Sequence, residues 1–432
     1  MLEQHNISGS WLTRLRSDAS RRLEQLPFPA GTEEAWRFTD LGLLDPGQFT
    51  ATTRAAIPDS APGAAGEVAM PPQLDHASAG GLVVRVDAGF HSLHLDAKLR
   101  QAGVLLMDLD QAAREHGDLL REHLGQLVGA DDYFTARALA HESGGVFLHV
   151  PSGVELSAPM RILSWYTAAT AGRVIHPRHV IVVGQGARVI LDDVQASEPD
   201  ATNRRPTLVA PVVELFVGQG ASVSWVTSQE LGRGFRQLAH LKARLEREAR
   251  LEATVLSLGA DYTRTRQEVI LDGVGASSQM LGAYFPTGSQ RVEHWTVQDH
   301  RAPRTRSDLL HLGALSGDAR AVYNGTIRIQ PQAAHSDAYQ SNRNLVLTPS
   351  ARAITNPQLE ISNNDVRCTH GATVGPLDEE ALFYLMSRGI PRLEAGRLVV
   401  QGFFGRLLQR MSWSGASERL AAAVERKTQE AA

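Results

Sequence analysis

Cysteine is nearly absent from this sequence of 432 residues, since Cys368 is the only one. A single thiol cannot form a disulfide within the chain, and by itself it cannot build the multi-cysteine cage of a structural zinc or iron–sulfur site. We therefore expect the protein in the cytoplasm. Any metal chemistry would need further ligands from other residues or another chain.

Long apolar runs and an excess of one charge are also absent. No run reaches the roughly 18 residues of a membrane span, and the N-terminus lacks the basic and apolar regions of a signal peptide. The 43 Lys and Arg against 47 Asp and Glu give a net charge of −4, which argues against a general nucleic-acid-binding surface. The G-x-x-x-x-G-K-[ST] motif is missing, so we expect no ATP hydrolysis by this chain alone. The G-x-S-x-G nucleophile motif is also missing. Membranes and nucleic acids are not expected partners.

Three regions differ in their patterns. Residues 1–142 are expected to be partly helical, with helices over 10–26, 108–123 and 130–141 and a loop rich in Ala, Pro and Gly over 55–81. Residues 375–432 contain three helix-like patterns, beginning with LDEEALFYLMSRGI. The intervening residues 143–374 alternate short Val, Ile and Leu runs with turns, which indicates β-strands.

A turn followed by a strand recurs through residues 143–374. The sequence VGQGA occurs at 183–187 and again at 217–221, and looser copies place an alanine after a turn at positions 187, 221, 249, 276, 319 and 351. Recurrence every few tens of residues is typical of a solenoid. We predict a mainly β protein with a parallel β-helix core, in which the six alanines occupy equivalent positions of successive coils.

The second C-terminal helix has more apolar residues than one buried stripe needs, especially over 398–408. Such a surface either caps the solenoid or binds a partner. Buried aromatic residues tend to dominate protein interfaces. We therefore take Phe403 and Phe404 as candidate anchors for a partner.

The segment around Cys368 and His370 has the clearest potential for chemistry. If it is extended, the two side chains share one face, with Cα atoms about 6.5–7 Å apart. Sulfur and imidazole could then give two ligands to iron or zinc, or a nucleophile beside a base. Alone they are too few for a stable site, and the simpler interpretation is a half-buried thiol next to a hydrogen-bonded histidine.

Several motifs occur together near the C-terminus: NPQLEI at 356–361, C-x-HGAT-x-G at 368–375, and LDEEALFYLMSRGI at 377–390. In this order they resemble the SufB/SufD family of iron–sulfur cluster assembly proteins, and EEAWRFTDL at 33–41 resembles an N-terminal motif of the SufD branch. The resemblance implies a right-handed parallel β-helix between helical regions. It also implies a complex of SufB, SufD and two copies of the ATPase SufC, which assembles nascent clusters.

The cysteine count favours the SufD branch. SufB-like chains carry a sulfur-accepting cysteine inside the β-helix, whereas this sequence has no thiol before Cys368. The resemblance implies that His370 contributes to a nascent cluster facing a SufB cysteine, so His370 is our candidate metal ligand. Cys368 is a weaker candidate. We expect a non-catalytic scaffold subunit with partners resembling SufB and SufC, and a transient cluster that this chain alone does not bind permanently.

Two other functions remain open. Two copies of the chain would offer two Cys368 and two His370, formally enough for a [2Fe–2S] cluster on a SufB-like homodimer. A parallel β-helix can also carry a carbohydrate-active enzyme. Such enzymes need stacked carboxylates or basic groups, and the acidic residues Asp192, Asp193, Glu214 and Glu230 do not recur at the repeat period.

Overall fold

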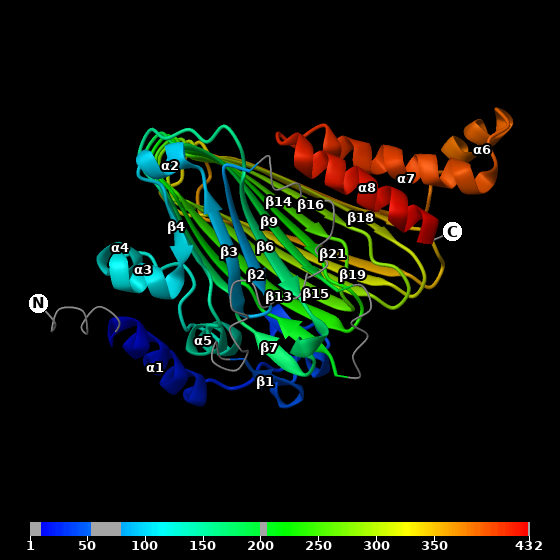
Figure 1. Cartoon of the computed structure of the whole chain (residues 1–432). Helices are drawn as coiled ribbons and strands as arrows, with labels where there is room; N and C mark the ends of the chain where they lie inside the picture. Colours follow the sequence, from blue (N-terminus) through cyan, green and yellow to red (C-terminus); the bar gives the residue numbers. More distant parts are fainter. Residues whose placement is uncertain (1–9, 53–78, 199–204, 431–432) are drawn as a thin grey trace, which may run out of the picture.

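The computed structural model describes residues 10–52, 79–198 and 205–430 and is dominated by two long β-sheets (Figure 1). Most of the loop predicted over 55–81 lies outside these residues. Sheet A has twelve strands: β1 (Thr50–Ala51), β4 (Leu105–Asp108), β5 (Val146–Val150), β7 (Arg173–Ile175), β8 (Arg178–Val183), β10 (Thr207–Val209), β11 (Val212–Val217), β13 (Phe235–Leu245), β15 (Tyr262–Leu271), β17 (Arg291–His300), β19 (Arg320–Ile329) and β21 (Arg352–Ile361).

Sheet B has ten strands: β2 (Gly81–Val86), β3 (Gly89–Leu95), β6 (Met160–Tyr166), β9 (Arg188–Ser197), β12 (Ser222–Glu230), β14 (Arg250–Ser257), β16 (Ser277–Tyr284), β18 (Arg306–Leu315), β20 (Asp337–Val346) and β22 (Arg367–Gly375). From β11 onward, successive strands alternate between the sheets, and each pairs in parallel with the strand one coil earlier. The chain is therefore a parallel β-solenoid, as predicted.

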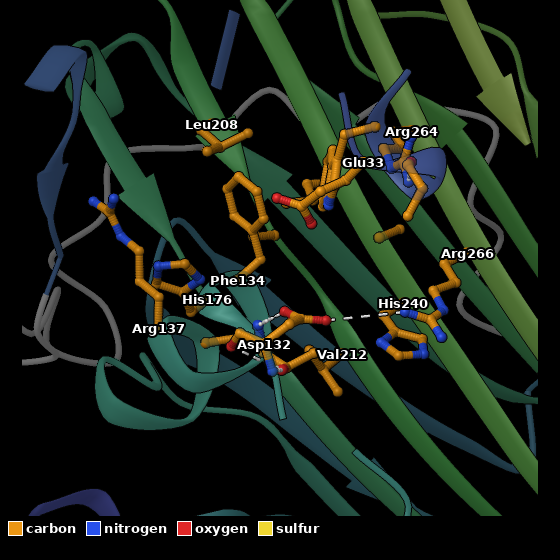
Figure 2. Close-up of a pocket in the computed structure, with 17 residues that line it drawn as sticks. Glu33, Asp132, Phe134, Arg137, His176, Leu208, Val212, His240, Arg264 and Arg266 are labelled. Carbon is orange, nitrogen blue, oxygen red and sulfur yellow. Dashed lines mark hydrogen bonds and ion pairs between the residues drawn. The ribbon is translucent and has the colours of Figure 1, made fainter. Parts of the chain in front are cut away.

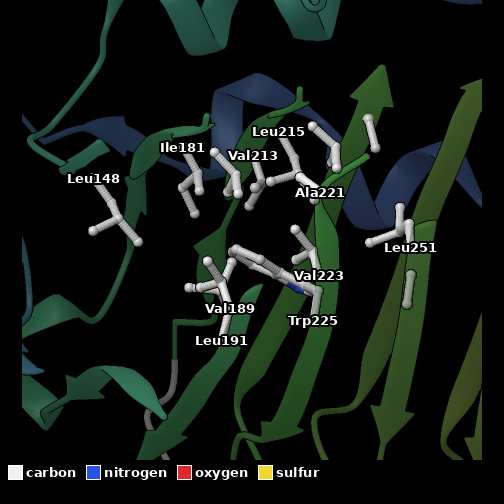
Figure 3. Packing of buried hydrophobic residues seen from close by; sticks show 14 of the residues in the cluster. Leu148, Ile181, Val189, Leu191, Val213, Leu215, Ala221, Val223, Trp225 and Leu251 are labelled. Atoms are coloured by element: carbon white, nitrogen blue, oxygen red, sulfur yellow. The ribbon is translucent and has the colours of Figure 1, made fainter. Parts of the chain in front are cut away.

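The core lies between the two sheets and is formed by alternate side chains of each strand. Val189 and Leu191 of β9 face Val213 and Leu215 of β11, with Trp225 of β12 between the layers (Figure 3). All five side chains are at least 95% buried. Full burial of such an apolar side chain contributes about 1.5–3 kcal/mol relative to exposure, so the β-solenoid is stabilised coil by coil.

The six repeated alanines are buried at solenoid corners, but they are not equivalent. Four of them immediately precede sheet B strands that are aligned in one register: Ala187, Ala221, Ala249 and Ala276. Ala319 and Ala351 instead precede β19 and β21 of sheet A. The prediction of six equivalent positions was therefore wrong, and the step from Ala276 to Ala319 crosses from one sheet to the other.

The N-terminal region combines helices with strands of both sheets. Its helices are α1 (Ser10–Gln25), α2 (Ala97–Gln101), α3 (Leu109–Glu115), α4 (Gly117–Arg121) and α5 (Tyr133–Ala140), with short 3₁₀ turns over Glu34–Trp36, Leu41–Leu44 and Pro46–Gln48. A further 3₁₀ turn, Ala168–Thr170, lies between β6 and β7 of the solenoid. The predicted 108–123 helix is divided into α3 and α4. Strands β1 to β4 of this region belong to the two sheets. The domain boundaries at residues 142 and 374 stay predictions.

Three helices follow the solenoid, as the sequence predicts: α6 (Glu379–Ser387), α7 (Arg392–Leu408) and α8 (Ser414–Glu430). The α7 and α8 helices pack on the outer face of sheet B, whereas α6 lies at the far end of this pair (Figure 1). Phe404 of α7 stacks on Phe285 with ring centroids 6.2 Å apart. In the described part of the chain, no helix combines the length and apolarity needed to cross a membrane.

Candidate functional site

The last coil of the solenoid, formed by β21 and β22, leaves one end of the fold open. Within the described ranges, β21 pairs only with β19 and β22 only with β20, so each presents a free edge. No further coil covers the inward side chains, and Leu359, Ile361 and Val374 are 37%, 44% and 45% exposed. A free strand edge with exposed apolar groups can pair with another chain. We call this end the solenoid mouth.

Cys368 and His370 both lie on the inward face of β22 at the solenoid mouth. In the register of sheet B, Cys368 is aligned with Ala338 and His370 with Gln340. Ala338 and Gln340 are 1% and 0% exposed and point into the solenoid. Residues two apart share a face of a strand, so the sequence motif places both potential ligands at the opening.

The two side chains differ in their surroundings. Cys368 is half-buried and packs with Val366 against a cluster that includes Ile327 and Ile329. Burial raises the pKa of the Cys368 thiol, and the Asp337 carboxylate raises it further. The thiol is therefore a weak nucleophile unless a metal displaces its proton. His370 is exposed at the solenoid mouth, where its imidazole can meet a ligand from another molecule.

Behind the mouth, the interior of the solenoid becomes polar. Ser307 Oγ lies 2.7 Å from both Gln298 Nε2 and His300 Nε2, and Gln340 Nε2 donates to the carbonyl of Gly325 at 3.1 Å. Burial lowers the pKa of His300 to about 4, so its imidazole is neutral near pH 7. The interior next to Cys368 and His370 thus offers neutral hydrogen-bonding groups rather than charges.

Cys368 and His370 are too few to hold a metal ion without further ligands. Across residues 10–52, 79–198 and 205–430, no three His, Cys, Asp or Glu side chains gather into a group that could hold a metal ion. Iron–sulfur clusters bind cysteine sulfur and accept histidine in place of cysteine. The chemistry of the pair fits a cluster whose other ligands come from a second chain.

The N-terminal motif over 33–41 lies against the outer face of sheet A and reaches the last coil. Gln358 Nε2 of β21 donates to Glu34 Oε1 at 2.9 Å. The Arg264 guanidinium donates to the carbonyl of Ala35 and to Thr39 Oγ1, both at 2.7 Å. Two motifs more than 300 residues apart in sequence are therefore in contact, which their patterns alone did not indicate.

Phe403 and Phe404, the two candidate anchors, both contact the apolar cluster between α7 and sheet B. Phe404 is only 1% exposed and Phe403 packs partly on the same cluster, so Phe404 is not available to a partner in this conformation. In the C-terminal helices, the most exposed apolar side chains lie on α6 and at the start of α7: Phe383 (73%), Tyr384 (57%) and Leu393 (54%). These residues were not among the candidates chosen from the sequence. Apolar residues on several sides of a helix nevertheless indicate that more than one face of the helix is covered.

Known families account for nearly the whole chain. Residues 166–403 match the model described as "SUF system FeS cluster assembly, SufBD core domain", and residues 1–162 match the SufBD protein N-terminal region. The chain belongs to the SufBD family. It is therefore an iron–sulfur cluster assembly protein, and the solenoid mouth lies within the part that matches the SufBD core domain.

Curated relatives agree with this assignment. A SufBD family protein of Mycobacterium tuberculosis is 34% identical over 269 residues, which cover 59% of this chain and 68% of the relative. A SufBD family protein of Mycobacterium leprae is 30% identical over 431 residues, 97% of this chain and 96% of the relative. The iron–sulfur cluster assembly protein SufD of Bacillus subtilis is 27% identical over 424 residues, 97% of this chain and 94% of the relative.

Proposed function

We propose that this chain is a SufD-like scaffold subunit, without catalytic activity of its own, that supports formation of a nascent iron–sulfur cluster. Its partners are a SufB-like paralogue and a SufC-like ABC ATPase, and it works in the cytoplasm. The observation that carries the proposal is the incomplete pair of Cys368 and His370 beside the free edge of β22. The cluster is a transient cargo, shared with the paralogue.

The free edges explain how the missing ligands would arrive. An edge strand offers unsatisfied N–H and C=O groups to an incoming strand. A second solenoid docked at the mouth would also bury the exposed side chains of Leu359, Ile361 and Val374. Such an interface brings a thiolate of the paralogue to His370. The raised pKa of the Cys368 thiol makes Cys368 the less important ligand of the two.

The ATPase would dock at α6. Phe383, Tyr384 and Leu393 present aromatic and aliphatic surface, and aromatic residues are frequent energetic centres of interfaces. The burial of Phe404 in the chain's own structure supports moving the proposed anchors from α7 to α6. The remaining role of Phe403 is to pack edge-on against Phe404, with ring centroids 5.3 Å apart.

The homodimeric alternative uses the same mouth. A second copy would bring another Cys368 and His370, and anaerobic reconstitution of the isolated protein, followed by visible absorbance, separates it from a heterocomplex. No observation favours a carbohydrate-active enzyme. The carboxylates of Asp192 and Glu214 have no exposed surface and form ion pairs with arginines.

The test replaces each candidate ligand in the co-expressed complex with the paralogue and the ATPase. We expect His370→Ala to lower cluster absorbance and iron content sharply while the complex stays assembled, because a ligand is lost without a change in packing. Cys368→Ser should have a smaller effect. His335→Ala is the matched control, since His335 is an exposed histidine that pairs with Asp365 at 2.9 Å in the preceding corner.

Two results would contradict the assignment. Wild-type cluster content in the His370→Ala complex would exclude His370 as a ligand. A larger loss in Cys368→Ser than in His370→Ala would reverse the roles of the two residues.

A further inference from the structure

A separate cavity of about 210 Å³ lies between the N-terminal region and the outer face of sheet A (Figure 2). Trp36 and Phe134 line it from the N-terminal side, and Leu208, Val212 and Leu238 line it from the solenoid. The two aromatic rings lie 4.9 Å apart. The walls are therefore mostly apolar, with two aromatic rings on one side whose planes are tilted by 41°.

One buried histidine of the cavity lining has no hydrogen-bond partner. His176 is 3% exposed, and neither ring nitrogen has a partner in the structure. Burial and the nearby Arg137 cation lower the pKa of His176 well below its usual value, so the ring is neutral. A neutral imidazole has one donor and one acceptor to satisfy, and buried polar groups usually have partners. His176 thus has capacity for a ligand.

An unpaired cation accompanies this histidine. Arg137 of α5 is 8% exposed and has no carboxylate partner among the described residues. The other two arginines of the lining are already paired, Arg264 with Glu293 at 2.8 Å and Arg266 with Glu268. Figure 2 shows Arg137 and His176 at one side of the cavity and Arg264 and Arg266 at the opposite side.

We propose that this cavity binds a small monocarboxylate with a planar, apolar body. The carboxylate would lie at Arg137 and His176, because guanidinium and carboxylate groups form strong, geometrically matched hydrogen bonds. The body would lie against Trp36 and Phe134, where ring faces favour offset or edge-on contact. An apolar cavity of about 150 Å³ can hold benzene, so the observed volume admits a single aromatic ring with one substituent.

The carboxylates in the lining limit the charge of the ligand. Glu33 and Asp132 belong to the cavity wall, and Asp132 is only 3.9 Å from the Arg266 guanidinium. They would repel a phosphate or a dicarboxylate more than a single negative charge. Because the walls come from the N-terminal region and the solenoid together, the ligand would also stabilise their contact.

The test measures binding of benzoate to the full chain by isothermal titration calorimetry. Benzoate should bind saturably, and its neutral analogue benzyl alcohol and the dianion terephthalate should each bind at least about tenfold more weakly. Ala239→Phe places a ring in the cavity from β13 and should reduce benzoate affinity by at least about tenfold. Arg137→Gln should do the same, whereas Arg114→Gln, at an exposed arginine outside this cavity, should not.

The comparison between probes uses the unaltered protein, so it decides the matter even if Arg137→Gln fails to fold. Absence of saturable benzoate binding up to about 10 mM would overturn the proposal. Equal affinity for benzoate and benzyl alcohol would show that the protein does not recognise the carboxylate. Unchanged benzoate binding in Ala239→Phe would show that benzoate binds outside this cavity. None of these outcomes bears on the role of His370 in cluster formation.

Discussion

Arg419 of α8 and Asp192 of β9 form a two-point ion pair, with Nη1 2.8 Å from Oδ1 and Nη2 3.0 Å from Oδ2. The Asp192 side chain is completely buried, and it also accepts a hydrogen bond from Arg161 Nε at 2.9 Å. One carboxylate therefore connects the C-terminal helices to the outer face of sheet B.

Asp192→Ala should destabilise the protein by about 3–5 kcal/mol, because it leaves the largely buried Arg419 guanidinium without the carboxylate that it pairs with. Urea unfolding followed by circular dichroism measures the loss. Glu230→Ala is the control, since it removes a partly exposed pair with Arg426 at 3.6 Å and should cost at most about 1 kcal/mol. Equal losses in the two variants would show that Asp192 does not hold the helices.

The solenoid could be predicted from the sequence because the pattern that indicates it, a turn followed by a strand, is local and recurs along the chain. Alanine occurs at a corner of several coils, and Ala187 and Ala319 are both completely buried there. Because alanine occurs at corners of both sheets, the six positions look equivalent in the sequence. In the following coils Thr305 and Ser336 occupy the sheet B corner instead, so alanine no longer marks this corner in the sequence.

The inward direction of Cys368 and His370 could also be predicted, since it follows from the two-residue period of a strand. The burial of Phe404 could not. Helical periodicity identifies apolar residues but not the surface that covers them, and Phe404 is covered by Phe285, which lies 119 positions earlier in the chain. The cavity around His176 was missed for the same reason, because its walls come from distant segments.

A second stability prediction concerns Gly313 of β18. A Cβ atom at this position would lie 2.0 Å from Tyr284 Cε2 and 2.5 Å from Asn344 Oδ1. These two side chains are buried and hydrogen-bonded to each other at 2.7 Å. Gly313→Ala should therefore lower the free energy of unfolding by about 1–3 kcal/mol through overpacking.

The matched control is Gly375→Ala at the end of β22, where a Cβ atom meets nothing within 4 Å. We expect its effect to stay within about 0.5 kcal/mol. Thermal unfolding of both variants gives the comparison. A Gly313→Ala protein as stable as the control would show that the interior of these coils can rearrange around Tyr284.

The raised pKa of Asp193 should make the free energy of unfolding depend on pH. The pKa of this carboxyl is raised from 3.8 to about 7, chiefly by burial and also by the neighbouring Asp192, against the effects of Gln195 and Arg85. In the unfolded chain the group ionises at its ordinary, lower pKa. Folding therefore costs free energy when Asp193 must be charged, and this cost is released as the pH falls from about 7 towards 4.

Asp193→Asn mimics the protonated carboxyl and removes that cost. The variant should be more stable than the unaltered protein by a few kcal/mol at about pH 8, and the difference should vanish near pH 4. Urea unfolding at several pH values measures it. A difference that does not change with pH would show that Asp193 titrates as it does in the unfolded chain.

The final prediction tests the exposed aromatic surface of α6. Phe383→Asp combined with Tyr384→Asp should strongly reduce co-purification of the ATPase, because the change places two charges where an apolar contact is proposed. These side chains are 73% and 57% exposed, so the melting temperature of the isolated chain should change little. Leu93→Asp, at a 38% exposed position on β3, is the control for a charge introduced elsewhere.

Phe404→Asp should behave in the opposite way. It buries a charge within the apolar contact between α7 and sheet B, so it should lower the melting temperature and release the C-terminal helices. Loss of the ATPase in this variant would therefore follow from unfolding, whereas loss in the α6 variant would follow from the contact itself. If the α6 variant retains the ATPase while remaining folded, the partner binds at another surface and the exposed aromatic residues need a different explanation.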